Sequence, residues 1–201
     1  NPALVQFDFI CLHGIWTWVT DADRKNICEF IDKKLRPGGL LYISYNALPA
    51  WSNFLPIQKL FSAYCEHNKT INSDEQTNLT DSFRFAQKLI ETKPKFLKAN
   101  PGVKTALEKI QNRDPKYLVH EYLAADFTPM TFDTISQWLR PLNMSYVCPT
   151  DFLHDMPGIN LTQEQQKFLL EIKNVVFRET CRDLMVNKDF KQDYWVKGVS
   201  P

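Results

Sequence analysis

The chain has 201 residues, 44% of them hydrophobic and 13% aromatic, so it can build a sizeable core and does not have the composition of a disordered protein. Its formal net charge of +1 gives no electrostatic sign of a nucleic-acid partner. No apolar run reaches the roughly 18 residues that a membrane span needs, and the five cysteines include no Cys-x-x-Cys pair. We therefore expect a cytoplasmic protein with free thiols, no metal site, and no nucleic-acid or membrane partner.

The first 46 residues predict a strand, a helix and a second strand. Phe7–Leu12 and Leu40–Ser44 are short apolar runs, typical of parallel strands that are covered on both faces. Between them, Thr20 and Asp23 predict a capping box, and Pro37-Gly38-Gly39 predicts the turn that ends the helix. The helix should direct an apolar stripe inward, formed by Ile27, Phe30, Ile31 and Leu35.

The middle of the chain, roughly residues 74–125, predicts an insertion of helices. A helix from Trp51 to about His67 comes first, and the polar segment Asn68–Asn78 is expected to be a linker. Further helices are expected from Thr80, around Val103 and Leu107, and from Asp114-Pro115.

The last third predicts helices between two strands. Thr131–Leu139 should be a helix with Phe132, Ile135 and Leu139 inward, followed by a strand at Met144–Cys148. Thr162 and Gln165 predict a capping box that opens one long helix, and Asp193–Val199 predicts the final strand. The apolar stripe of the long helix would include Phe168, Leu169, Ile172, Val176 and Leu184, and its charged residues Arg178, Arg182 and Asp183 should form an intrahelical salt bridge.

Several motifs resemble a known family. FDFICLHGIWTWV, residues 7–19, and LRPGGLLYISYN, residues 35–46, resemble strand four, the following helix and strand five of class I S-adenosylmethionine-dependent methyltransferases. YNALPAW, residues 45–51, is similar to the segment after strand five in bacterial methyltransferases that carry a methyltransferase regulatory domain, some of which are protein-lysine methyltransferases. Two further segments resemble the regulatory domain itself: YLVHEYL, residues 117–123, with Pro129, and residues 178–198.

The resemblance implies an α/β fold class, with a partial Rossmann-like sheet in the strand order 4-5-7-6 and a large helical insertion. Strand seven would be antiparallel and would lie between strands five and six. Residues 1–70 would form the C-terminal half of the methyltransferase core, and residues 71–201 a mostly helical regulatory region, with 144–148 and 193–199 returning to the sheet. The chain has six glycines and no Gly-x-Gly loop that opens a helix, so we expect it to be the C-terminal portion of such an enzyme.

The resemblance also implies a site at the carboxyl ends of the first two strands, where ligands bind in doubly wound folds. Leu12, His13, Gly14 and Trp18 would contact the cofactor, S-adenosyl-L-methionine. The alternative is a loop turn with a hydrogen-bonded histidine. Trp16 and Trp18 are both candidates for a pocket wall, but either can equally be a core residue.

The segment after the second strand would face the acceptor. Tyr45 and Asn46 are the candidate catalytic residues, because a hydroxyl or an amide can orient an amine, and Pro49 and Trp51 are the candidate substrate-binding residues. The alternative is a strand end followed by an asparagine turn. Ala50 replaces a glycine of the family pattern, which raises the question of a lost left-handed conformation. We favour helix packing over catalysis for His120, Glu121 and Tyr122, because neighbouring helical residues point in different directions.

The sequence therefore predicts the C-terminal portion of a methyltransferase that modifies a protein, with lysine as the acceptor, and an isolated chain without activity. Two alternatives stay open: a non-catalytic helical module for protein interaction, and a methyltransferase with a small-molecule acceptor. The first strand would have a bare apolar edge, which we expect an upstream methyltransferase half or a second copy to cover.

Overall fold

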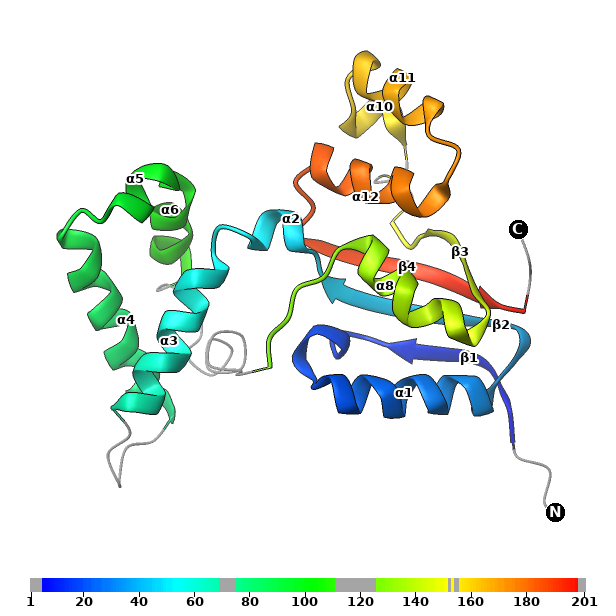
Figure 1. Ribbon diagram of the computed structural model, residues 1–201, viewed down its shortest axis with the longest axis horizontal. Coiled ribbons are helices and arrows are strands. Elements are labelled where there is room, and N and C mark those ends of the chain that lie inside the picture. The colour runs from blue at the N-terminus through cyan, green and yellow to red at the C-terminus, as the bar shows by residue number, and fades with distance from the viewer. Residues whose placement is uncertain (1–4, 69–74, 111–125, 152, 154–155, 199–201) are drawn as a thin grey trace. The chain divides into compact units, whose positions relative to one another are not determined.

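A computed structural model describes residues 5–68, 75–110, 126–151, 153 and 156–198. The chain divides into two compact units, residues 1–51 with 128–201 and residues 52–127. Figure 1 shows a sheet with helices in the first unit and helices alone in the second.

The first unit is built on a four-stranded sheet in the order β1-β2-β4-β3. β1 and β2 are parallel, and β4 is antiparallel to both of its neighbours. This is the strand order 4-5-7-6, with its antiparallel strand, so the predicted fold class is confirmed. The strands are β1, Phe7–Leu12; β2, Leu35–Asn46; β3, Met144–Pro149; and β4, Phe190–Lys197.

Helices α1, Asp21–Lys34, and α8, Phe132–Leu139, pack on one face of this sheet (Figure 1). Phe132 of α8 stacks on Trp195 of β4 with 5.4 Å between ring centroids. The three inward positions predicted for α8 are all fully buried, and Thr131 caps the helix by accepting a hydrogen bond from the Thr134 N–H. The core of the first unit therefore lies between the sheet and these two helices.

The inward stripe of α1 differs from the prediction. Ile31 is buried, but its neighbour Phe30 is 48% exposed and stacks on Phe7 of β1. Successive side chains of a helix turn by about 100°, so both cannot face the sheet. The buried positions follow helical spacing and are Arg24, Cys28, Ile31 and Leu35. One of the two hydrogen bonds of the predicted capping box is present, since Thr20 accepts a hydrogen bond from the Asp23 N–H; the Asp23 carboxylate accepts from the Thr20 hydroxyl.

The prediction that β1 is covered on both faces is wrong for this chain. Ile10 is buried on the helix side, whereas Phe7 is 42% and Phe9 is 49% exposed. Within the residues that the structure describes, β1 pairs with β2 alone. One edge and much of one face of an apolar strand are therefore open.

The single long helix predicted from Thr162 is also wrong, because it is broken in two. α11, Gln163–Glu171, begins with the predicted capping box between Thr162 and Gln165. α12, Val175–Met185, begins again at Asn174, whose side chain accepts a hydrogen bond from the Phe177 N–H. The stripe predicted across both helices is not continuous, and Phe168 and Leu184 are exposed.

Short elements complete the first unit: η1, Trp16–Trp18; α2, Leu48–Trp51; η2, Arg140–Leu142; and α10, Pro157–Asn160. The second unit contains α3, Leu55–His67; α4, Glu75–Glu91; α5, Lys95–Ala99; and α6, Pro101–Ile110.

The second unit has its own small core. Phe61 of α3 and Phe83 of α4 lie 4.8 Å apart between ring centroids, and the predicted inward residues Val103 and Leu107 are buried. The linker predicted up to Asn78 is too long, because α4 already begins at Glu75. The helix predicted from Asp114-Pro115 and the trio His120, Glu121 and Tyr122 lie outside the described residues.

Candidate active site

The loop after β1 is tied to side chains of β2. Gly14 has a φ of +66°, a left-handed conformation that favours glycine, and its N–H donates to Ser44 Oγ at 2.7 Å. His13 Nδ1 lies 2.9 Å from the Tyr42 hydroxyl, and both His13 and Gly14 are exposed. A Cβ added at Gly14 would meet nothing within 4 Å, so a ligand has room to approach the backbone.

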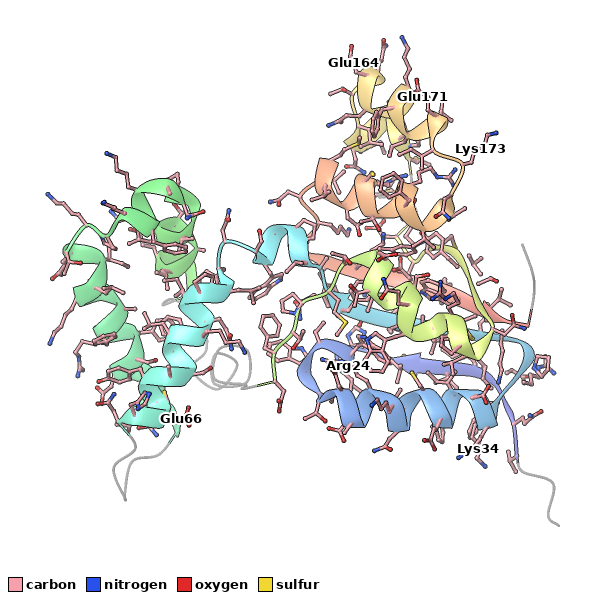
Figure 2. The ribbon with its side chains drawn as sticks, viewed as in Figure 1. Arg24, Lys34, Glu66, Glu164, Glu171 and Lys173 are labelled. Carbon is pink, nitrogen blue, oxygen red and sulfur yellow. The ribbon has the colours of Figure 1, made fainter. Side chains whose placement is uncertain are left out.

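The next residues anchor this loop to the core. Trp16 is fully buried and packs edge-on against Trp138, so it is a core residue and not a pocket wall. Arg24, labelled in Figure 2, is buried, and its Nε donates to the Trp16 carbonyl at 2.9 Å. A helical arginine gives no sequence signal of this role. Leu12 and Trp18, which we predicted to contact the cofactor, are half-buried.

The end of β2 brings Asn46 to the same loop. Asn46 Nδ2 donates to Thr17 Oγ1 at 3.0 Å, and the Asn46 carbonyl accepts from the Met130 N–H. Alternate side chains of a strand point to opposite faces, so Asn46 and Ser44 lie on the side of His13. The structure thus brings the predicted cofactor loop and Asn46 together.

Tyr45 points to the other face of the sheet. Its side chain is fully buried among the core residues, and its hydroxyl donates to Asp193 Oδ2 at 3.0 Å. Burial first, and the charge of Asp193 second, raise the pKa of Tyr45 well above its ordinary value. The phenol is therefore a hydrogen-bond donor that keeps its proton, and it does not face Gly14.

The segment after β2 folds as the short helix α2. The Ala47 N–H donates to the Asp189 carbonyl, and Trp51 Nε1 donates to the same carbonyl at 3.2 Å. Ala50 lies inside α2 and has no left-handed backbone, so alanine fits in place of the family glycine. Pro49 and Trp51 are half-buried beside this anchor.

A buried charge cluster lies next to Tyr45. Lys191 of β4 is 3% exposed, and its Nζ lies 2.9 Å from Asp183 Oδ1 and 3.3 Å from Glu179 Oε2. The ammonium also sits 4.2 Å from the ring centroid of Phe132, a cation–π contact. The predicted intrahelical salt bridge of Asp183 missed this partner, because Lys191 reaches it from a strand.

One ammonium in this cluster faces three carboxylates. Burial would lower the pKa of Lys191, but the charges of Asp193, Asp183 and Glu179 outweigh it and raise that pKa. Burial raises the pKa of Asp183, and it raises the pKa of Asp193 to about 7. The cluster therefore carries a surplus of negative charge, and Asp193 retains a proton on a large share of molecules at neutral pH.

A cavity of about 360 Å³ opens beside Lys191. Its wall is formed by the ends of β3 and α12, the loop after α12 and the start of β4. Among the described residues, no three His, Cys, Asp or Glu side chains are placed to hold a metal ion, and no described helix is long and apolar enough to cross a membrane.

Comparisons with known proteins identify part of this architecture. Residues 114–197 match the family model of the predicted methyltransferase regulatory domain. The chain is 33% identical to protein sll1526 of Synechocystis over 98% of its own length, and 24% identical to protein RP789 of Rickettsia prowazekii over 94%. It spans 38% and 36% of the lengths of these two relatives.

The fold is shared with PKMT2 from Rickettsia typhi. The similarity has a TM-score of 0.75 at 23% identity and covers 100% of this chain and 37% of PKMT2. The structure of PKMT2 in complex with AdoHcy gives the same TM-score at 24% identity, over 98% of this chain and 37% of that one. Together with the regulatory-domain match, these similarities confirm the family resemblance predicted from the sequence motifs.

Proposed function

We propose that the chain is the C-terminal portion of an S-adenosylmethionine-dependent methyltransferase that modifies lysine side chains of a protein. The observation that carries the proposal is the sheet, because its order and its antiparallel strand are those of a methyltransferase sheet from strand four onward. The regulatory-domain match and the fold shared with PKMT2, solved with AdoHcy, support it.

Gly14 and His13 are the proposed contacts to the methionine end of the cofactor, with Leu12 and Trp18 beside them. Their exposed backbone and the open space at Gly14 fit a ligand that lies against the loop. When bound, the cofactor supplies a methyl group on a sulfonium. The chain's own contribution is to position the loop through Ser44.

Asn46 is the proposed residue on the acceptor side, since it shares this face and its amide is held by Thr17. Pro49 and Trp51 would border the acceptor. Tyr45 is proposed as a positioning residue, because its hydroxyl is committed to Asp193 on the other face of the sheet. A Tyr45→Phe change should therefore act through the geometry of Asn46 and not through proton transfer.

The rest of the enzyme would cover β1. A strand with Phe7 and Phe9 exposed and with one unpaired edge invites pairing. The chain accounts for 37% of PKMT2, so a longer protein has ample length to supply the first three strands. In this proposal residues 1–70 form the C-terminal half of the methyltransferase core, and residues 71–201 form a mostly helical regulatory region from which 144–148 and 193–199 return to the sheet. The enzyme would work in the cytoplasm.

Methyl transfer by the protein in its full natural length tests the proposal. We expect labelled methyl groups from S-adenosylmethionine on lysines of protein acceptors, and a large loss of transfer in Asn46→Ala with the cofactor affinity retained. The loss should be about ten- to a thousand-fold, as for other positioning groups. Transfer to small molecules alone would replace the acceptor class, and no transfer to any acceptor by a protein that binds the cofactor would favour the non-catalytic module.

A further inference from the structure

The cavity beside Lys191 has two chemically different walls. Pro149, Val186 and Phe190 supply apolar surface, and Glu179 and Asp183 supply carboxylates. Its volume of about 360 Å³ lies within the range of about 300–1,000 Å³ for small-ligand pockets. An alkyl chain that ends in a charged group matches this arrangement.

The charge of the cavity wall determines whether the charged end of such a ligand should be positive or negative. The wall carries four carboxylates, those of Asp151, Glu179, Asp183 and Asp189, and three cationic side chains, those of Arg182, Lys188 and Lys191. Asp193, just behind Lys191, adds a further buried carboxyl. The negative charges outnumber the positive ones, so an additional cation is attracted and an additional anion is repelled.

One carboxylate oxygen of the residues that line the cavity has no hydrogen-bond partner among the described residues. Asp183 is 4% exposed and gives Oδ1 to Lys191, but its Oδ2 is buried without a partner among the described residues. A buried carboxylate oxygen left unpaired is costly, and buried polar groups are normally satisfied. Asp183 also lines the cavity, so a small rotation of its carboxylate group would turn this oxygen toward a donor that enters there.

The apolar wall favours an organic cation. The described residues contain no group of carboxylates, histidines or cysteines that could hold a metal ion, and the apolar wall suits a hydrocarbon stem. A lysine side chain has both parts, an alkyl stem and a terminal ammonium with three donors.

The carboxylates of the cavity also determine whether a lysine side chain bound there could accept a methyl group. Methyl transfer needs a neutral amine, but nearby carboxylates stabilise the protonated form and raise the pKa of an amine. The pKa of Lys191 in the same cluster is raised in this way. The cavity is therefore suited to hold a charged lysine and not to prepare one for attack.

Two residues of the cavity wall hold the segment that follows β2. Lys188 and Asp189 line the cavity, and their carbonyls accept hydrogen bonds from the N–H groups of Ala50 and Ala47 in the segment after β2. A substrate segment that passes over the segment after β2 can thus reach both regions.

From these observations we infer that the cavity is a recognition subsite for a second, non-reacting lysine side chain of the protein substrate. The inference deepens the proposed function and rests on it: the acceptor lysine lies at the sheet edge, and a neighbouring lysine gives specificity for basic segments. Glu179 and Asp183 would bind the ammonium, and Val186 and Phe190 would contact its stem.

The test is binding of small probes to the protein in its full natural length, without cofactor. Nα-acetyl-lysine amide should bind at least tenfold more tightly than Nα-acetyl-norleucine amide, which keeps the stem and lacks the charge. Asp183→Asn and Glu179→Gln should each remove most of this preference. Glu171→Gln, which removes an exposed carboxylate on α11 (Figure 2), is the matched control and should retain it. Calorimetry and thermal melting would report binding and folding together.

Equal binding of the two probes to the wild-type protein would overturn the inference without any variant. In methyl transfer, Asp183→Asn should raise the KM for a basic protein substrate several-fold and leave kcat nearly unchanged, whereas a change in kcat alone would indicate a positioning role instead. Methyl transfer with no probe preference refutes the subsite and keeps the enzyme. Probe preference without methyl transfer refutes the enzyme and leaves a lysine-binding cavity.

Discussion

Replacing Asp193 by asparagine should stabilise the protein at alkaline pH and flatten its response to pH. The Asp193 carboxyl is fully buried, and its pKa rises from an ordinary 3.8 to about 7, mainly because of burial. The folded protein thus binds more protons than the unfolded chain between these values, so stability falls as the pH rises through this window and levels off above it. At about 1.4 kcal/mol per pKa unit, the difference between pH 4 and pH 8 reaches about 4 kcal/mol as an upper value.

Asparagine keeps an oxygen that can accept from Tyr45 and removes the ionisation. In urea denaturation of the 201-residue chain, wild type and Asp193→Asn should have similar free energies of unfolding at pH 4, and the variant should be more stable at pH 8 by about 2–4 kcal/mol. Some pH dependence should persist, because burial also raises the pKa of Asp183. Glu171→Gln is the control for loss of one exposed carboxylate. A wild-type stability that is constant from pH 4 to pH 8, or an unchanged slope in the variant, would refute this account of the cluster.

Three further substitutions test packing, each by urea denaturation. Gly39→Ala should cost about 1–3 kcal/mol, because its Cβ would lie 2.7 Å from Leu35 Cδ1 and 2.9 Å from a backbone oxygen; Gly102→Ala, where nothing lies within 4 Å, should be neutral or stabilising and is its control. Phe132→Ala should cost about 3–5 kcal/mol, since the ring is fully buried against Trp195, and a loss below about 1 kcal/mol would contradict that packing. Thr162→Ala should cost about 1 kcal/mol through loss of the capping box, and no change would show that the cap contributes nothing.

The sequence predicted a helix correctly where its N-cap residue, the spacing of its apolar residues and its length all indicated the same element. Helix α8 follows an N-cap threonine, Thr131, and places Phe132 and Leu139 on one face, so both its ends and its inward side could be predicted. The sheet order came from the family resemblance, because strand order depends on pairings far apart in sequence. Tyr45 and Asp193, for example, are 148 residues apart and hydrogen-bonded.

The prediction failed where one local signal overrode another. The apolar spacing across α11 and α12 suggested one helix, but the asparagine at position 174 caps a new helix and changes which side chains face inward. Phe30 was assigned to the inward stripe by spacing alone, and Ile31 occupies that position instead. In both cases the pattern of apolar residues was compatible with more than one rotation of the helix.

The sequence indicated where the candidate site residues lie in the sheet, but not which side chains face the same way or which partners they have. Gly14 and Asn46 lie together at the carboxyl ends of two parallel strands, which strand polarity alone requires. Tyr45 was grouped with Asn46 because the two are adjacent, but adjacency on a strand sends them to opposite faces. The cluster around Lys191 could not be predicted from the sequence. Glu179 and Asp183 have the pattern of ordinary charged residues of a helix, and only the fold places the ammonium of Lys191, from a strand, between them.

The buried cluster joins the region that matches the regulatory-domain model to the sheet. Glu179 and Asp183 of α12 form ion pairs with Lys191 of β4, and Asp193 of β4 accepts a hydrogen bond from Tyr45 of β2. The charge of Asp193 also acts on Lys191, so the two groups influence each other electrostatically. A charge that enters the cavity would change the field on Asp193, whose pKa is about 7, and hence its protonation beside Tyr45. Each of these charged side chains can be replaced singly, so its effect on the protonation of Asp193 can be measured.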